Sequence, residues 1–185
     1  MDYFAYGSNM NLGHLRDWLR RFGVEPEGAT NPRRVLLPDH RLRTNYLTAS
    51  GWGAANVEPS CDDAVEGILL AISPEAREAL RAKEGWPRRY EETIVEVILP
   101  SNGKTLPALT YRVTPEHRLP VDVPVSPRYR ALILDGAKTA RLSRGYQSHL
   151  RRMLRTPLMM DPTTSVWCDE PTSTEDECSA DCRFI

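Results

Sequence analysis

The sequence lacks the features that would place it in several large functional classes. No apolar run approaches the roughly 20 residues of a membrane-spanning helix. The glycine-rich motifs that bind phosphate are absent, and the four histidines are scattered without the spacing of metal ligands. The net charge is −1, so the chain has no basic excess to attract nucleic acid. We therefore expect a protein that binds neither membranes nor nucleic acid and that holds no metal.

Cysteine is scarce in most of the chain. Cys61 stands alone in the body, whereas Cys168, Cys178 and Cys182 lie near the C-terminus. One cysteine cannot form a disulfide framework, so a reducing compartment is expected. The first predicted strand begins at residue 2 and leaves no room for a signal peptide. These features predict a cytoplasmic protein. Cys178 and Cys182 are interpreted as free thiols, with a late disulfide between them as the alternative.

The composition divides the chain into a body and a tail. Residues 157–185 contain seven acidic residues and one basic residue, which gives this segment a net charge of −6. Because the whole chain has a net charge of −1, residues 1–156 have a net charge of +5. The tail is rich in Asp, Glu, Thr, Ser and Pro, a composition typical of disorder. We predict one domain over residues 1–156 and an acidic, cysteine-containing tail over 157–185.

The order of the predicted elements favours an α+β fold over a doubly wound parallel sheet. Strands are expected at residues 2–6, at 34–47 in two pieces around a turn at Pro38-Asp39, and at 54–58, 64–72, 90–99 and 106–113. Helices are expected from Asn9 or Asn11 to Arg21, from Pro74 to Gly85, from Ser126 or Pro127 through Ala137, and over residues 143–154. Residues 25–32 are predicted to form a loop.

The turn Tyr6-Gly7-Ser8-Asn9 is the first candidate site. It joins an apolar strand to a helical pattern, so backbone N–H groups are left unpaired at the positive end of a helix. Glycine lets a ligand approach the backbone, and Ser8 and Asn9 add polar side chains. The turn is therefore interpreted as a pocket for a carboxylate. The alternative is a simple strand-to-helix connection with a good N-cap.

Glu84 is the second candidate. It lies near the end of a predicted helix, next to Gly85 and Trp86. The negative end of the helix dipole and burial against Trp86 would both raise the pKa of this carboxyl group, which suits proton transfer. The alternative is a solvated glutamate that pairs with Arg81 or Lys83.

Three tyrosines complete the set of candidates. Tyr90, Tyr111 and Tyr129 lie in or beside predicted regular elements, where their hydroxyls can orient an amide or a carboxylate. The alternative is that each is an amphipathic aromatic at the edge of the core.

Several segments, in order, resemble the γ-glutamylcyclotransferase family, within the AIG2-like superfamily. The resemblance covers about residues 2–155 and rests on the opening strand with its Tyr-Gly-Ser-Asn turn and on four later segments. Those segments are Gly53-Ala54-Ala55-Asn56-Val57, Lys83-Glu84-Gly85 followed by Tyr90, Tyr111, and Ser126-Pro127-Arg128-Tyr129 followed by Asp135-Gly136-Ala137. Trp86-Pro87-Arg88-Arg89 departs from the small and polar residues of the family.

The resemblance implies a mixed, largely antiparallel β-barrel flanked by helices. It implies that a γ-glutamyl compound cyclises on itself and releases 5-oxoproline and a free amine or amino acid, without a cofactor. Glu84 would be the general acid and base, and the substrate-binding residues would be Tyr6, Gly7, Ser8, Asn9, Tyr90, Tyr111 and Tyr129. The turn at Gly7-Ser8 would hold either the α-carboxylate or the developing oxyanion.

Two rival functions use the same fold. In the first, the same chemistry removes a γ-glutamyl protecting group from a biosynthetic intermediate; Trp86, Arg88 and Arg89 would fit a large or acidic leaving group. In the second, the chain is a non-catalytic module that binds a small molecule. The sequence specifies neither the leaving amine nor the role of the tail, and a homodimer stays open.

Overall fold

The computed structural model describes residues 1–154, so the predicted tail and three of the four cysteines lie outside the described residues. Over this range the strands form a closed barrel in the order β1-β3-β2-β4-β5. The strands are β1 (Asp2–Ala5), β2 (Ala29–Leu47), β3 (Gly53–Ile72), β4 (Tyr90–Ile98) and β5 (Thr105–Val113). β1 and β5 pair in parallel, and the other pairs are antiparallel. The predicted mixed, largely antiparallel barrel with flanking helices is confirmed.

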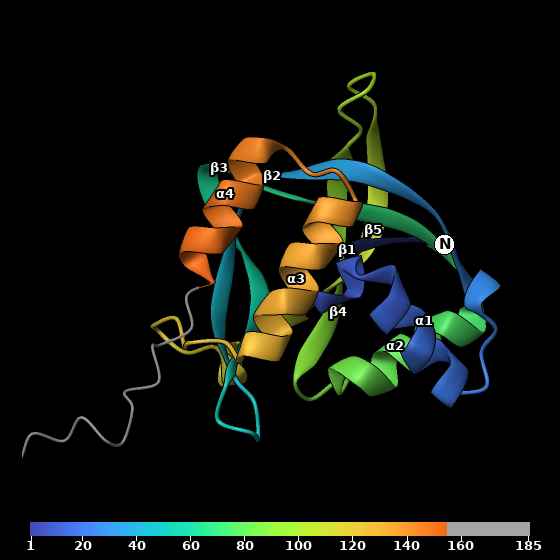
Figure 1. Cartoon of the computed structure of the whole chain (residues 1–185), viewed down its shortest axis with the longest axis horizontal. Helices are drawn as coiled ribbons and strands as arrows, with labels where there is room; N and C mark the ends of the chain where they lie inside the picture. Colours follow the sequence, from blue (N-terminus) through green and yellow to red (C-terminus); the bar gives the residue numbers. More distant parts are fainter. Residues whose placement is uncertain (155–185) are drawn as a thin grey trace, which may run out of the picture.

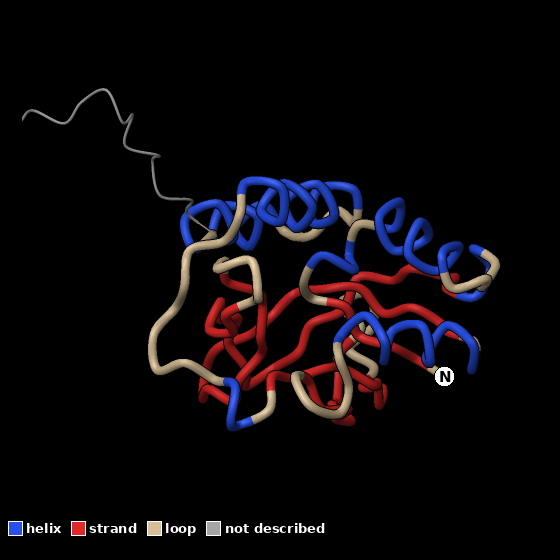
Figure 2. Tube along the Cα trace, turned by 90° about the horizontal axis from the view of Figure 1, so that it is seen from below, coloured by secondary structure: helices blue, strands red, loops and turns tan. Residues whose placement is uncertain are grey.

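Helices flank the barrel (Figure 1). They are α1 (Leu12–Arg21), α2 (Pro74–Glu84), α3 (Pro127–Thr139) and α4 (Arg144–Met153), with short 3-10 helices η1 (Ser8–Met10), η2 (Pro26–Gly28) and η3 (Pro115–His117). In Figure 2, α3 and α4 lie together along one side of the strands. No helix within residues 1–154 is long and apolar enough to cross a membrane.

The helix ends follow the sequence signals. Asn11 caps α1 by accepting a hydrogen bond from the His14 N–H, so Asn11 rather than Asn9 is the N-cap. Ser73, Ser126 and Ser143 cap the other three helices in the same way, through their hydroxyls. The side chain of Asn9 is thereby left to act elsewhere.

Two strand predictions are wrong. β2 does not break into two pieces at Pro38-Asp39, but it changes register between Pro38 and His40. β3 is one strand of 20 residues rather than two strands separated by a loop. The same register change lets residues 60–63 bulge out of β3, because Pro38 pairs with Ala64 while His40 pairs with Pro59. The predicted loop over residues 25–32 is also shorter, since β2 already begins at Ala29.

The core fills the barrel and the seams beneath the helices. Its largest fully buried side chains are Phe4, Met10, Leu15, Leu19, Leu37, Ile68, Leu69, Leu70, Leu80, Leu109, Ile133 and Leu150. Strand β4 buries the side chains of Val95 and Val97, whereas Ile94 on its other face is exposed. Apolar burial on this scale is the main source of stability and holds the elements that carry polar groups in fixed positions.

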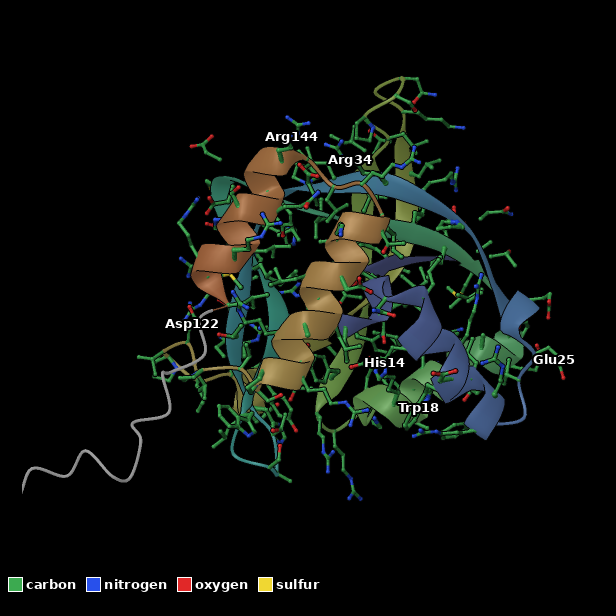
Figure 3. The ribbon with its side chains drawn as sticks, in the orientation of Figure 1. His14, Trp18, Glu25, Arg34, Asp122 and Arg144 are labelled. Atoms are coloured by element: carbon green, nitrogen blue, oxygen red, sulfur yellow. The ribbon has the colours of Figure 1, made fainter. Side chains whose placement is uncertain are left out.

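Two close contacts fix the helices around the start of the chain. Trp18 on α1 donates from Nε1 to the Ala79 carbonyl of α2 at 2.9 Å, and Figure 3 shows it between these helices. On the other side, α3 packs directly on the chain after η1. A Cβ on Gly136 would lie 2.7 Å from the Asn11 nitrogen, so only glycine allows this approach. The 3-10 turn after β1 is thus held between helices on both sides.

Candidate active site

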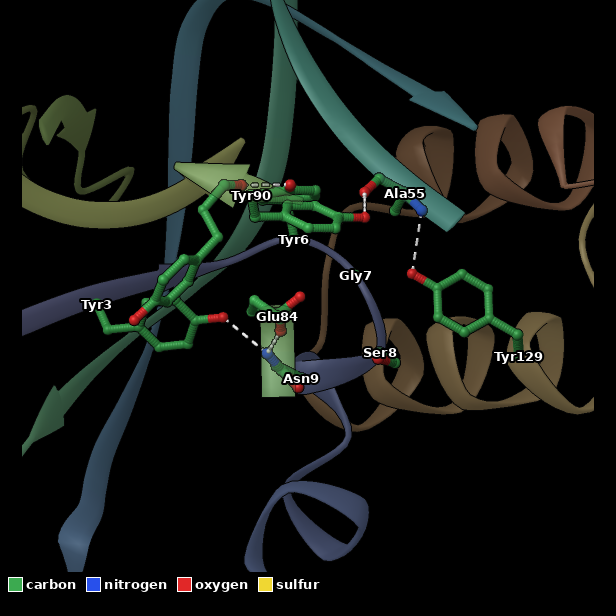
Figure 4. A pocket seen from close by; sticks show the side chains of 10 residues that line it. Tyr3, Tyr6, Gly7, Ser8, Asn9, Ala55, Glu84, Tyr90 and Tyr129 are labelled. Atoms are coloured by element: carbon green, nitrogen blue, oxygen red, sulfur yellow. Dashed lines mark hydrogen bonds between the residues drawn. The ribbon is translucent and has the colours of Figure 1, made fainter. Parts of the chain in front are cut away.

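A pocket opens at the point where β1 leaves the barrel (Figure 4). It has an empty volume of about 310 Å³ and is lined by Tyr3, Tyr6, Gly7, Ser8, Asn9, Ala55, Glu84, Tyr90, Tyr111 and Tyr129. The structure therefore brings together all eight residues that the sequence proposed for the site. It adds Tyr3, which sequence reasoning treated only as part of the opening strand, and it uses Ala55 from the small-residue segment of β3.

The turn after β1 forms one wall of this pocket. Tyr6 and Gly7 lead into η1, whose Met10 N–H donates to the Gly7 carbonyl at 3.1 Å. A Cβ on Gly7 would lie 3.3 Å from the Tyr129 hydroxyl and 3.4 Å from the Ala55 Cβ. Glycine at this position therefore leaves the space between β1, β3 and α3 that a ligand needs.

Glu84 is the last residue of α2 and lies opposite this turn. Its Oε1 accepts a hydrogen bond from Asn9 Nδ2 at 2.9 Å, and no side chain within residues 1–154 bonds to its Oε2. Burial raises the pKa of Glu84, whereas the charge of Lys83 and the Asn9 hydrogen bond act in the opposite direction. The carboxyl group thus has one oxygen fixed and one available to a ligand.

Asn9 uses all of its polar atoms within the protein. Its Nδ2 donates to Tyr3 Oη at 2.8 Å as well as to Glu84, and its Oδ1 accepts from Lys83 Nζ. Two carboxamide hydrogens and the carboxamide oxygen are therefore committed. The Asn9 side chain therefore orients the carboxyl group of Glu84, and the substrate contact expected at Asn9 stays a prediction.

Four of the five tyrosines of the pocket fall into two groups by their hydrogen bonds. Tyr3 Oη and Tyr129 Oη accept hydrogen bonds, the latter from the Ala55 N–H at 3.1 Å, so their own hydrogens are free to donate. In the other group, Tyr6 donates to the Tyr111 carbonyl at 2.6 Å and Tyr90 donates to the Ala55 carbonyl at 3.0 Å. These hydroxyl oxygens are free to accept. The pocket therefore offers donors and acceptors on different walls.

Burial keeps these phenols protonated, and the nearby charge of Glu84 acts in the same direction. Burial raises the pKa of Tyr129 to about 12 against hydrogen bonds from Ala55 and Ser8. The pKa values of Tyr3, Tyr6, Tyr90 and Tyr111 are also raised, in each case chiefly by burial. The hydroxyls therefore act as hydrogen-bonding groups rather than as bases.

A partly buried ion cluster joins α2 to β4, and the sequence analysis did not identify it. Glu92 on β4 binds Arg77 and Arg81 of α2 through paired hydrogen bonds of 2.6–3.0 Å. Tyr111 Oη also donates to Glu92, at 3.0 Å. These contacts attach the helix that carries Glu84 to the barrel wall that carries Tyr111. Arginines one turn apart on a helix, opposite a strand glutamate, were the available signal.

A second pocket adjoins the first and opens to the surface. It has an empty volume of about 960 Å³ and shares Ser8, Glu84, Tyr90 and Tyr129 with the inner pocket. Its remaining walls are His14, Tyr46, Thr48, Ala49, Ala54, Lys83, Arg89, Ser126, Arg128 and Leu132. Of the three unusual residues after Gly85, only Arg89 lines it. Trp86 instead covers the Arg81 guanidinium, at 4.2 Å from the ring centroid.

The described residues give no sign of a metal centre. Residues 1–154 contain no group of three or more His, Cys, Asp or Glu side chains arranged to hold a metal ion. Cys61 is exposed on the bulge of β3 and takes no part in either pocket.

Comparisons with known proteins agree with this geometry. The profile of the AIG2-like family matches residues 64–150. The chain is 28% identical over 160 residues to a γ-glutamylcyclotransferase from Bos taurus, covering 80% of this chain and 76% of the relative. The resemblance predicted from the sequence is confirmed.

Solved structures share the fold. One named γ-glutamyl cyclotransferase superposes with a TM-score of 0.73 at 24% identity, covering 86% of this chain and 91% of that one. An uncharacterized protein from Homo sapiens superposes with a TM-score of 0.69 at 26% identity, covering 96% of this chain and 92% of the other. The barrel and its flanking helices thus belong to an architecture that solved structures share.

Proposed function

We propose that this chain, which resembles the γ-glutamylcyclotransferases in sequence and fold, cyclises a γ-glutamyl compound to 5-oxoproline and releases an amine or amino acid. The observation that carries the proposal is Glu84. It is a carboxylate of raised pKa at the junction of the two pockets, with one oxygen fixed by Asn9 and the other available. A general base whose pKa lies nearer to neutrality transfers protons more effectively.

The reaction needs little beyond positioning and proton transfer. The α-amino nitrogen of the glutamyl unit attacks its own γ-carbonyl carbon, so the reacting atoms are already in one molecule. Ionised Glu84 accepts a proton from this nitrogen as the new C–N bond forms. It then returns the proton to the leaving nitrogen as the original amide C–N bond breaks. Atoms balance without water or a cofactor.

The inner pocket matches the polar groups of a glutamyl unit. Tyr3 and Tyr129 have hydroxyl hydrogens free to donate to a carboxylate or to the developing oxyanion, and Ser8 lies beside Tyr129. The hydroxyl oxygens of Tyr6 and Tyr90 are free to accept from the amino group. Preorganised donors of this kind stabilise a tetrahedral intermediate because they need not reorient as charge develops.

Replacing the carboxylate tests the proposal. We expect Glu84→Gln to fold normally and to lose nearly all release of 5-oxoproline from γ-glutamyl-alanine, because glutamine cannot accept the proton. Glu78→Gln is the matched control: Glu78 lies on the same helix with an exposed side chain and makes a surface pair with Arg81. Near wild-type turnover by Glu84→Gln, or an equal loss in Glu78→Gln, would contradict the assignment.

A further inference from the structure

Basic side chains outnumber acidic ones in the wall of the outer pocket. Lys83, Arg89 and Arg128 line it, together with His14. Within residues 1–154 its one acidic lining residue is Glu84, which belongs to the junction with the inner pocket. Charged side chains of one sign around a partly enclosed space raise the local concentration of ions of opposite sign.

These charges act on one another across the pocket. His14 projects from α1, and its pKa is lowered first by burial and then by the charges of Lys83 and Arg128, against the opposing effect of Asp17. Burial also lowers the pKa of Lys83 itself, while the charge of Glu84 raises it. Lys83 and Arg128 therefore both lie close enough to His14 to disfavour a proton on its ring, which an anion between them would offset.

The three cations lack carboxylate partners in the described part of the chain. Within residues 1–154 no Asp or Glu oxygen lies within 4.0 Å of Lys83, Arg89 or Arg128, whereas Arg77 and Arg81 on the neighbouring face of α2 are both paired with Glu92. Lys83 Nζ has one acceptor there, Asn9 Oδ1, so two of its three hydrogens are uncommitted.

The position of Arg89 is restricted by the end of α2. Its side-chain stem packs on Gly85, where an added Cβ would lie 2.8 Å from Arg89 Cδ. The Arg89 N–H also donates to the Gly85 carbonyl at 3.0 Å. The chain thus holds a basic side chain one short loop away from the catalytic glutamate.

We propose that the outer pocket binds the leaving group of the γ-glutamyl substrate and selects an acidic amino acid, with two carboxylates. This inference rests on the proposed function. If Glu84 lies beside the scissile amide, the glutamyl unit fills the inner pocket and the leaving nitrogen points into the outer one. One α-carboxylate would neutralise one cation, whereas an acidic residue supplies a second carboxylate to the remaining pair. Charge-assisted hydrogen bonds to such groups are the stronger class.

Two substrates that differ by one charge test the inference. γ-Glutamyl-glutamate and γ-glutamyl-glutamine have the same length and shape, but only the first carries the second carboxylate on its leaving group. We expect kcat/KM for the glutamate compound to exceed that for the glutamine compound by at least about tenfold, the effect of one charge-assisted hydrogen bond. Equal values would overturn the inference.

Variants assign the selectivity to the pocket. Arg89→Gln and Arg128→Gln should each lower kcat/KM for γ-glutamyl-glutamate by about tenfold more than kcat/KM for γ-glutamyl-glutamine. Arg88→Gln is the control, since Arg88 is exposed, carries the same charge and does not line the pocket. An equal loss on both substrates, or the same loss in Arg88→Gln, would overturn the inference.

Failure of the proposed function has a different signature. Release of 5-oxoproline from γ-glutamyl-glutamine tests the cyclisation without the second carboxylate. If neither compound released 5-oxoproline, the proposed function would be wrong. Calorimetry of both compounds with the wild-type protein would then test whether the outer pocket still prefers the acidic one. Tighter binding of γ-glutamyl-glutamate by about tenfold would support the subsite, and equal affinities would overturn it.

Discussion

Asn9→Leu should shift the pH dependence of the reaction by changing the pKa of Glu84. In the wild type, Asn9 Nδ2 donates to Glu84 Oε1 at 2.9 Å, and this hydrogen bond favours the ionised carboxylate. Leucine has a similar volume and removes the donor. The pKa of Glu84, already raised by burial, should therefore rise further.

The size of the shift follows from the hydrogen bond that is lost. A hydrogen bond to a charged group contributes about 1.5–3 kcal/mol, and one pKa unit corresponds to about 1.4 kcal/mol. The variant should therefore raise the pKa of Glu84 by about one unit or more. As the general base, Glu84 must be ionised, so activity falls as the pH falls through this pKa. The acidic limb of the kcat profile should move to higher pH by the same amount.

The assay is the release of 5-oxoproline from γ-glutamyl-alanine between about pH 4 and 9, a range that begins near the ordinary glutamate pKa and extends well above it. Asn11→Ala is the matched control. Asn11 lies two residues away and caps α1, so its loss should cost about 1 kcal/mol of stability without moving the acidic limb. An acidic limb that stays in place in Asn9→Leu, or that moves to lower pH, would refute the reasoning.

Two further variants test the support of the site. Glu92→Gln should destabilise the protein by about 1 kcal/mol at pH 7, because it breaks the partly buried pairs with Arg77 and Arg81, which solvent screens. Burial acts to raise the pKa of Glu92, but hydrogen bonds from Arg77, Arg81 and Tyr111 outweigh it and lower the pKa to about 2. The stabilisation is therefore present above the ordinary glutamate pKa and lost as the pH falls toward 2, which urea unfolding at several pH values would detect; a constant difference across that range would contradict it. Gly7→Val should fill the space beside Tyr129 and raise KM for γ-glutamyl-alanine at least about tenfold, and an unchanged KM would make the turn a mere connector.

Most helices and strands could be predicted from the sequence because the patterns that mark them are local. Apolar alternation predicted the strand over residues 90–98, and a serine before an apolar run predicted the start of three helices. The prediction of a strand break at Pro38-Asp39 was wrong because whether a proline interrupts a strand depends on the strand that pairs with it. β3 absorbs the irregularity by bulging at residues 60–63, a property of the strand pair that one strand cannot reveal.

The candidate site was only partly accessible from the sequence. Tyr6-Gly7-Ser8-Asn9 and Glu84 are about 75 residues apart, and it was the family resemblance that joined them; the hydrogen bond between Asn9 and Glu84 now gives that pairing a physical form. Tyr3 was missed because an aromatic residue in an apolar strand is most simply read as core. Its hydroxyl becomes significant only when the barrel closes and Asn9 reaches it at 2.8 Å.

Glu92 on β4 and Glu84 at the end of α2 are carboxylates with different surroundings. Glu92 is part of the structural ion cluster, whereas Glu84 is the proposed base. Glu92 is bound by two arginines and a tyrosine hydroxyl, so its charge is fully compensated and its pKa is lowered to about 2, far from the range of proton transfer. Glu84 is also withdrawn from water, but it receives one neutral amide donor, while the nearby ammonium of Lys83 bonds to Asn9 instead. Burial therefore prevails at Glu84 and its pKa rises. A direct arginine partner would lower the pKa of Glu84, so the use of Asn9 as an intermediary keeps the carboxylate oriented while its pKa stays raised, as the proposed role as a base requires.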